Sequence, residues 1–231
     1  GWIRSIVEDL GEPAVAAAGA PYEPPHGATW VQRVYDSLRD HRPGRRDVRW
    51  LGSGNLAVVR SRFVEVGGFS EALATCEDVD LCFRLRERGF RILSDSRVRS
   101  VHHGDPRTIG ELFRSELWRG RSNLAVSLRS RPRAGDLPSI LMPIGFLGSL
   151  ALVALGIATT PFGGASWAAA GLAGIGVVTG LRTARMVANS AAPPPAGILR
   201  VLVVAAVYEA ARALALVIDV RHRRVTAARA A

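Results

Sequence analysis

The sequence has no lysine, only two cysteines and, across residues 137–181, no ionisable side chain at all. Two cysteines, Cys76 and Cys82, are too few and too ordinarily spaced for a disulfide framework or a zinc site. Both are therefore expected to be reduced, structural thiols. The uncharged stretch is far longer than the roughly 20 apolar residues that cross a bilayer, which argues against a purely soluble protein.

Charge divides the chain into two unlike halves. Residues 1–136 hold 22 arginines and 18 acidic residues, a balance typical of a soluble domain. Residues 137–231 hold 8 arginines and only 2 acidic residues. Much of the net charge of +10 therefore flanks apolar stretches instead of forming a patch with interleaved aromatic residues. This distribution favours a membrane surface over nucleic acid as the partner.

Segments of helical and strand periodicity alternate along the first half, which predicts an α/β domain. Helices are expected at residues 2–10, 29–38, 63–66, 81–88 and 108–122, and Thr29 is expected to cap the second of them. Strands are expected at residues 14–18, 48–51, 56–59, 91–93 and 98–102.

A membrane region is expected at residues 137–220, after an arginine-rich connector at residues 124–136 and before a basic tail at residues 221–231. Residues 138–160 and 165–181 predict two spans joined by a tight, uncharged turn. Arginines in the connector, together with Arg182 and Arg185, predict that both ends of this hairpin are cytoplasmic.

The third apolar segment, residues 197–220, allows two placements. Tyr208, Glu209, Arg212 and Asp219 fall within an arc of about 80° on a helical wheel, which favours a helix lying in the membrane interface. The alternative is a third span in which Glu209 and Arg212, one turn apart, pair inside the bundle.

Two acidic residues, Glu77 and Asp78, precede the helix expected at residues 81–88. A carboxylate at the positive end of a helix is held outward and can act as a general base. The plainer interpretation is that Asp78 or Asp80 only caps the helix. The neighbouring motifs bear on this choice, and they run in the following order: residues 52–55, Gly67-Gly68-Phe69, Glu77-Asp78, Arg84-Leu85, Gly89-Phe90-Arg91 and His102-His103.

This order of motifs resembles glycosyltransferase family 2 over residues 1–123. The resemblance implies part of a GT-A (Rossmann-like) α/β domain, followed here by an α-helical membrane region. It also implies transfer of a sugar, with inversion, from a nucleotide-sugar donor to a lipid-linked or polysaccharide acceptor. Asp78 would be the general base, and Glu77 would complete the catalytic dipeptide.

The resemblance further implies a Mg²⁺ or Mn²⁺ ion held by an Asp-X-Asp pair and joined by a histidine. That histidine is expected to be His102, with His103 as the alternate, because neighbouring strand residues face opposite sides. Residues 78–80 spell Asp-X-Asp but follow no hydrophobic strand, so they are interpreted as the base loop. Residues 1–3 resemble the segment that follows the metal pair. The pair and the donor-binding strands are therefore expected before Gly1, and the chain alone is expected to be inactive.

The resemblance assigns six residues to substrate binding: Ser53, Gly54, Asn55, Trp118, Arg119 and Arg121. A tight turn alone also explains the residue types of the first three. The last three stand where processive relatives carry Gln-X-X-Arg-Trp, and because this sequence departs from that motif, processivity is not expected. The two arginines could bind a diphosphate or a lipid phosphate, or simply face the membrane surface.

The sequence supports two functions from different classes. The first is a multi-pass glycosyltransferase of the cell (inner) membrane with a cytoplasmic catalytic domain, whose partners are a nucleotide sugar, a glycan or lipid-linked acceptor and membrane lipids. The second is a non-catalytic membrane interaction or scaffold module derived from a glycosyltransferase. The presence of Glu77, Asp78 and His102 favours the enzyme.

Overall fold

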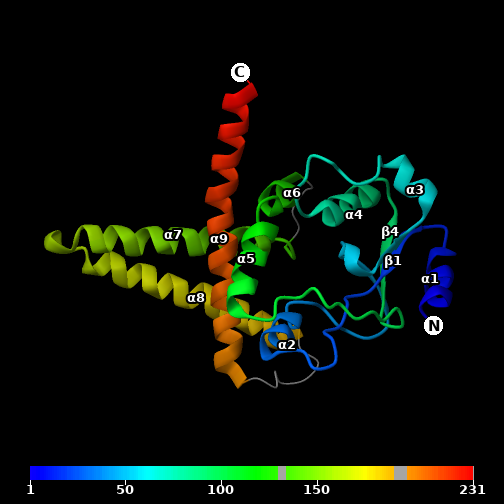
Figure 1. Cartoon of the computed structure of the whole chain (residues 1–231), viewed down its shortest axis with the longest axis horizontal. Coiled ribbons are helices and arrows are strands. Elements are labelled where there is room, and N and C mark those ends of the chain that lie inside the picture. Colours follow the sequence, from blue (N-terminus) through cyan, green and yellow to red (C-terminus); the bar gives the residue numbers. More distant parts are fainter. Residues whose placement is uncertain (130–133, 190–196, 231) are drawn as a thin grey trace.

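The computed structural model describes residues 1–129, 134–189 and 197–230. Figure 1 shows a mixed α/β region with a small sheet and, beside it, the long helices of the second half of the chain. The helices at residues 137–158 and 165–189 form a hairpin that projects away from the sheet, and the helix at residues 197–230 crosses the hairpin near its base.

The α/β region runs from the start of the chain to residue 129. Its elements are α1 (Trp2–Leu10), β1 (Val15–Gly19), α2 (Trp30–Asp36), β2 (Arg45–Val48), the short helix η1 (Ser53–Asn55), β3 (Leu56–Val58), α3 (Arg60–Glu65), α4 (Glu77–Glu87), β4 (Arg91–Asp95), α5 (Ile109–Arg119) and α6 (Asn123–Arg129). The helical region contains α7 (Leu137–Ala158), the short helix η2 (Thr160–Phe162), α8 (Ala165–Asn189) and α9 (Gly197–Ala230).

The four described strands form one sheet in the order β2-β4-β1-β3. The central strands β1 and β4 are parallel, and each outer strand is antiparallel to its neighbour. All five residues of β1 are buried, and the strand is built from small side chains. Gly19 ends it where a Cβ atom would lie 2.0 Å from the Asn55 carbonyl oxygen. The close approach of the turn before β3 therefore requires glycine at this position.

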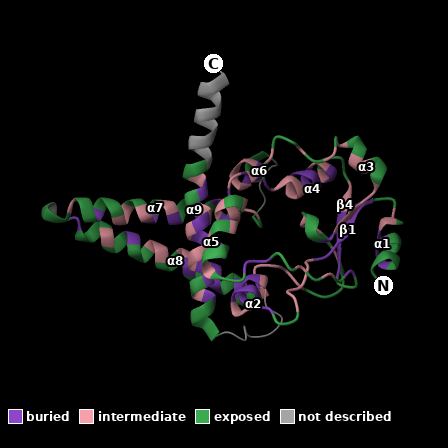
Figure 2. Cartoon of the chain, in the orientation of Figure 1, coloured by how far each residue is buried: buried purple, intermediate pink, exposed green. Residues whose placement is uncertain are grey.

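Three clusters of buried apolar side chains form the core. One packs α4 on the sheet, a second packs α1 on its strands, and a third joins α2 and α5 to α8 and α9. The third cluster consists of Val31, Val34, Tyr35, Leu112, Met186, Val201, Val204 and Ala205. The α/β region and the long helices therefore share a hydrophobic core, and Figure 2 shows the buried residues where α5 and α9 meet.

Helices α7 and α8 pack closely along the hairpin through small residues. A Cβ atom at Gly156 would lie 2.3 Å from the Ala168 backbone nitrogen, and one at Gly171 would lie 2.6 Å from the Ser149 carbonyl oxygen. Glycine at such positions lets helix backbones approach each other, as in membrane helix pairs. The outer surface of the hairpin exposes large apolar side chains, including Ile157 and Leu172, and Figure 2 shows this exposure toward the tip.

Two helices in the described part of the chain are long and apolar enough to cross a membrane: Leu137–Ala158 and Gly197–Ile218. Helix α8 does not join them, because glycines and Arg182 lower its hydropathy. It also continues to Asn189, past both arginines that were expected to mark its end. Together with the exposed apolar surface, these helices weakly indicate membrane association. The expected cytoplasmic orientation stays a prediction.

Several expected elements have other bounds in the structure. The strand expected at residues 48–51 lies at Arg45–Val48. The strand expected at residues 98–102 is absent from the described sheet, because this segment pairs only through one bridge between Glu23 and Val101. The helix expected at residues 108–122 ends at Arg119, and part of the connector forms the separate helix α6.

Two charged residues of the polar arc in the third apolar segment, Glu209 and Arg212, have ion-pair partners inside the protein. Glu209 is fully buried and its Oε1 accepts from Arg182 Nε at 2.5 Å, while Arg212 Nε donates to Glu116 Oε2 at 2.8 Å. Glu209 and Arg212 are therefore paired with α8 and α5, not with each other as the spanning alternative supposed. The side chain of Asp219 lies outside the described residues. Whether α9 crosses the bilayer or lies along it stays a prediction.

Candidate active site

Asp78 lies in the first turn of α4, which begins at Glu77, four residues before the expected start of the helix at residue 81. Its Oδ2 accepts a hydrogen bond from the Ser53 backbone N–H at 2.8 Å, and its Oδ1 accepts one from the Val79 N–H at 2.8 Å. Cys76, just before the helix, adopts a left-handed conformation with φ of 63°, which is uncommon for a residue other than glycine. This local geometry holds the Asp78 carboxylate against the turn at residues 52–55.

The turn at residues 52–55 lies between Asp78 and an aromatic pair. A Cβ atom at Gly52 would lie 3.8 Å from Asp78 Oδ2, and one at Gly54 would lie 2.9 Å from the Tyr22 ring and 3.8 Å from His102 Cδ2. Ser53 and Gly54 are exposed. The structure therefore brings four of the predicted residues, Ser53, Gly54, Asp78 and His102, around one exposed turn.

His102 is held by its neighbours on two sides. Its ring centroid lies 4.3 Å from that of Tyr22, and its Nδ1 lies 3.3 Å from Asp105 Oδ1. A carboxylate on one ring nitrogen fixes the orientation of an imidazole and leaves the other nitrogen available. His103, the alternate, is exposed. The geometry therefore favours His102 over His103 as the histidine of the site.

The described residues do not form a metal site by themselves. No group of three or more His, Cys, Asp or Glu side chains comes together in them in a way that could hold an ion. His102 offers one ring nitrogen, which is fewer ligands than a Mg²⁺ or Mn²⁺ site needs. The expected Asp-X-Asp pair before Gly1 stays a prediction, and the chemistry below uses only the residues of this chain.

Three further residues that the sequence reasoning missed support this site: Tyr22, Arg39 and Asp105. The Arg39 guanidinium lies 4.0 Å from the centroid of the Tyr22 ring and donates to Asp105 Oδ1 at 2.7 Å. The side chain of Asp105 is completely buried. The spacing of Asp105, three residues after His102, was the available sequence signal for a contact between these two residues. Tyr22 gave no such signal, because it lies in a proline-rich loop without periodicity.

Asn55 is a structural residue in this fold. Its amide nitrogen donates to the carbonyl oxygens of Ala20 at 3.0 Å and Val98 at 2.8 Å, and its Oδ1 accepts from Trp2 Nε1 at 2.8 Å. The side chain is buried, and both amide protons and the oxygen are used. Because its hydrogen-bonding groups are engaged within the fold, the side chain has a structural role, and substrate binding by Asn55 stays a prediction.

Asp80 and Arg84 connect α4 to the glycine turn at residues 67–68. Asp80 is buried and accepts from Arg84 Nε at 2.8 Å and from Arg129 Nη1 at 2.9 Å. Arg84 also donates to the carbonyl oxygens of Val66 and Gly68. Gly67 and Gly68 both have positive φ angles, which glycine adopts without strain. These contacts give Asp80 a structural role in fastening the glycine turn to α4.

The residues at the end of α5 have three different environments. Trp118 is half exposed, whereas Arg119 donates to the Tyr35 hydroxyl at 2.5 Å and to Glu116 Oε1 at 3.2 Å. One end of the Arg119 guanidinium is thus engaged inside the protein. Arg121 Nε is buried and has no hydrogen-bond partner within the described residues. Binding of a phosphate by either arginine stays a prediction.

Both cysteines are unpaired, as the sequence predicted. Burial raises the pKa of the Cys82 thiol to about 12, and burial also raises the pKa of Cys76. A thiol with a raised pKa is a poor nucleophile because little thiolate forms. The cysteines therefore play no part in the chemistry of the site.

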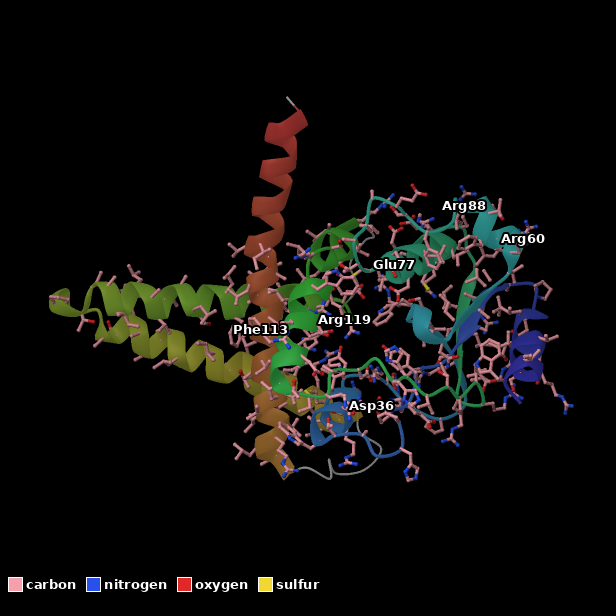
Figure 3. The ribbon with its side chains drawn as sticks, in the orientation of Figure 1. Asp36, Arg60, Glu77, Arg88, Phe113 and Arg119 are labelled. Atoms are coloured by element: carbon pink, nitrogen blue, oxygen red, sulfur yellow. The ribbon has the colours of Figure 1, made fainter. Side chains whose placement is uncertain are left out.

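An open hollow of about 410 Å³ adjoins the site through Ser53. Its other lining residues are Leu56, Val58, Arg60, Phe63 and Phe69. Figure 3 labels Glu77 at the start of α4, Arg119 at the end of α5 and Arg60 at the start of α3. The site is therefore framed by the starts of α3 and α4, the turn at residues 52–55 and the end of α5.

Comparison with known proteins identifies two kinds of relative. The succinoglycan biosynthesis protein ExoA of Rhizobium meliloti is 33% identical over 132 residues, which are 55% of this chain and 38% of ExoA. The pre-mycofactocin glycosyltransferase of Mycobacterium tuberculosis is 28% identical over 181 residues, which are 69% of this chain and 37% of that protein. No family model and no solved structure matches the chain.

These relatives support a relationship to glycosyltransferase family 2, at modest identity, as the motif order predicted. The chain spans less than two fifths of the length of either relative. The alignment with the pre-mycofactocin glycosyltransferase covers 69% of this chain, which is more than residues 1–123 contain. It therefore extends into the helical region. The shared sequence therefore includes part of the region after α5.

Proposed function

We propose that this chain forms the acceptor side of a membrane-associated, inverting glycosyltransferase in which Asp78 is the general base. The observation that carries the proposal is the placement of the Asp78 carboxylate. Backbone N–H groups of Ser53 and Val79 hold it beside an exposed turn that also contacts His102. The glycosyltransferase relatives supply the reaction class.

The chemistry requires one displacement. An acceptor hydroxyl oxygen forms a bond to the anomeric carbon of the donor, and the bond from that carbon to the diphosphate oxygen breaks, so the electron pair leaves with the nucleoside diphosphate. The hydroxyl proton passes to Asp78. Each carboxylate oxygen has a second lone pair beyond the one that accepts a backbone N–H, so the base can take this proton without losing its anchors.

A lipid-linked or polysaccharide acceptor fits the surroundings of the site. The end of α5 lies on α9, and two helices are long and apolar enough to span a bilayer. A site fixed beside such helices meets membrane-bound acceptors at high local concentration. The name of ExoA refers to biosynthesis of a polysaccharide, which agrees with this acceptor class.

The interaction or scaffold module stays the second candidate. It would be favoured if no Asp-X-Asp pair preceded Gly1 in the full-length protein. A module of this kind would bind partners without transferring sugar. The enzyme proposal is supported better, because both relatives are named for biosynthesis or glycosyl transfer and the Asp78 geometry serves a base.

A transfer assay separates the two candidates. Membranes containing the full-length protein are incubated with radiolabelled nucleotide sugars and with extracted polyprenyl-linked glycans, and the labelled lipid fraction is counted. The enzyme proposal expects label in the lipid fraction that depends on the protein. Absence of transfer with every common nucleotide sugar, in membranes where the protein is folded, would favour the scaffold module.

A further inference from the structure

Glu116 on α5 is a completely buried carboxylate with three donors from three helices. Its Oε1 accepts from the Tyr35 hydroxyl on α2 at 2.5 Å and from Arg119 Nη1 at 3.2 Å. Its Oε2 accepts from Arg212 Nε on α9 at 2.8 Å. Burial disfavours a charged carboxylate, but Arg212 and Arg119 outweigh that effect and hold the pKa of Glu116 below its usual value. Glu116 is thus an ionised junction of α2, α5 and α9.

The same face of α5 touches α9 one turn later. A Cβ atom at Gly120 would lie 2.6 Å from the Ala215 Cβ and 3.3 Å from Arg212 Cδ. No larger side chain fits there unless the helices separate. The end of α5 is therefore set directly by the position of α9, through the Glu116 ion pair and through close packing.

The other side of the α5 end holds the segment that leads to Asp78. The Arg119 carbonyl oxygen accepts from the Thr75 hydroxyl at 3.2 Å and from the Cys76 thiol at 3.7 Å. The Thr75 hydroxyl also accepts from the Ser122 backbone N–H at 3.3 Å. These hydrogen bonds hold Cys76, whose backbone is in the left-handed conformation. Cys76 directly precedes the first turn of α4, which carries Asp78. A residue in such a strained conformation persists only where its surroundings fix it.

We propose that Glu116 is a positioning residue that couples the membrane helix α9 to the base loop, so that the placement of Asp78 depends on the seating of α9 against α5. The path runs from Arg212 through Glu116 and Arg119 to Thr75 and Cys76. The inference rests on the proposed function for its consequence on sugar transfer. The coupling itself is a property of the fold and can be measured without turnover.

The test compares Glu116→Gln with Arg114→Gln, a matched control on an exposed position of the same helix. Hydrogen–deuterium exchange is followed in the detergent-solubilised protein for residues 74–79. Glu116→Gln keeps the side-chain shape but removes its charge, so exchange at residues 74–79 is expected to rise, while the control matches the unaltered protein. Gly120→Ala separates α5 from α9 without removing any charged group, because the added Cβ would lie 2.6 Å from the Ala215 Cβ, and it is expected to raise exchange in the same segment.

Kinetics provides the second readout. With an acceptor that the unaltered full-length protein glycosylates, Glu116→Gln is expected to lower kcat roughly 10- to 100-fold, the range that a small misplacement of catalytic groups can cost. The KM for the donor is expected to stay within about twofold of the unaltered value, because the donor does not contact the buried Glu116. Unchanged exchange at residues 74–79 in both Glu116→Gln and Gly120→Ala would overturn the coupling. Absence of transfer by the unaltered protein would instead count against the proposed function, while the exchange result would still decide the coupling.

Discussion

Replacing Asp78 by asparagine is expected to lower sugar transfer by roughly 10²- to 10⁴-fold, the usual contribution of a general base, while donor binding is retained. Asparagine keeps an oxygen that can accept the Ser53 N–H, so the turn at residues 52–55 keeps its anchor. The amide cannot take the proton of the acceptor hydroxyl. Initial rates with saturating donor, together with donor affinity from equilibrium binding, measure the two effects separately.

The control for this prediction is Glu87→Gln, at the exposed far end of the same helix. It removes one negative charge from α4 without approaching the turn at residues 52–55. Its rate is expected to match that of the unaltered protein. Retained turnover in Asp78→Asn, with a normal melting temperature, would refute the assignment of Asp78 as the base.

Removal of the Asn55 side chain is expected to destabilise the fold strongly. Asn55→Ala leaves the Ala20 and Val98 carbonyl groups and the Trp2 indole N–H without their partner. Each buried polar group left unpaired costs about 1–3 kcal/mol, so a loss of about 3 kcal/mol in unfolding free energy is expected. Denaturant unfolding in detergent, followed by tryptophan fluorescence, measures the loss.

Ser53→Ala is the matched control, since Ser53 is exposed and its contact with Asp78 uses the backbone N–H. Its unfolding free energy is expected to change by less than about 0.5 kcal/mol, as is usual at surface positions. A stable Asn55→Ala protein that no longer transfers sugar would contradict the structural role. That result would favour substrate binding by Asn55.

Local patterns predicted much of the first half of the fold. Apolar spacing located α1, and Thr29 caps α2 as predicted. Its hydroxyl accepts from the Gln32 N–H, and its own N–H donates to Gln32 Oε1. The order of motifs located the turn at residues 52–55, Asp78 and His102, which the structure brings together. Such features can be predicted from the sequence because residues close together in the chain determine them.

Long-range pairing explains what the sequence could not reveal. Glu116 and Arg212 are 96 residues apart, and Arg182 and Glu209 are 27 apart, so no local spacing connects them. The polar arc on α9 therefore suggested a water-facing side, although its charges meet partners from α5 and α8. The contact of Arg119 with Tyr35 was likewise not predicted, because the two residues are 84 apart in the chain.

The segment at residues 98–102 shows a related difficulty. Its valines, Val98 and Val101, are β-branched and favour a strand, yet the segment pairs only through the bridge between Glu23 and Val101. The segment still does what the site needs, because the His102 backbone N–H donates to the Glu23 carbonyl oxygen at 2.9 Å. Strand propensity thus predicts only an extended local backbone, whereas strand pairing depends on the rest of the fold.

The anomeric configuration of the product tests the central claim most directly. A single displacement assisted by Asp78 inverts the anomeric carbon, so an α-linked nucleotide sugar is expected to give a β-linked product. Proton NMR of the isolated glycan reports the configuration through the coupling constant of the anomeric proton, for sugars with an axial proton at C2. A β-linked product that disappears in Asp78→Asn is the predicted result, and an α-linked product from the same donor would contradict the account.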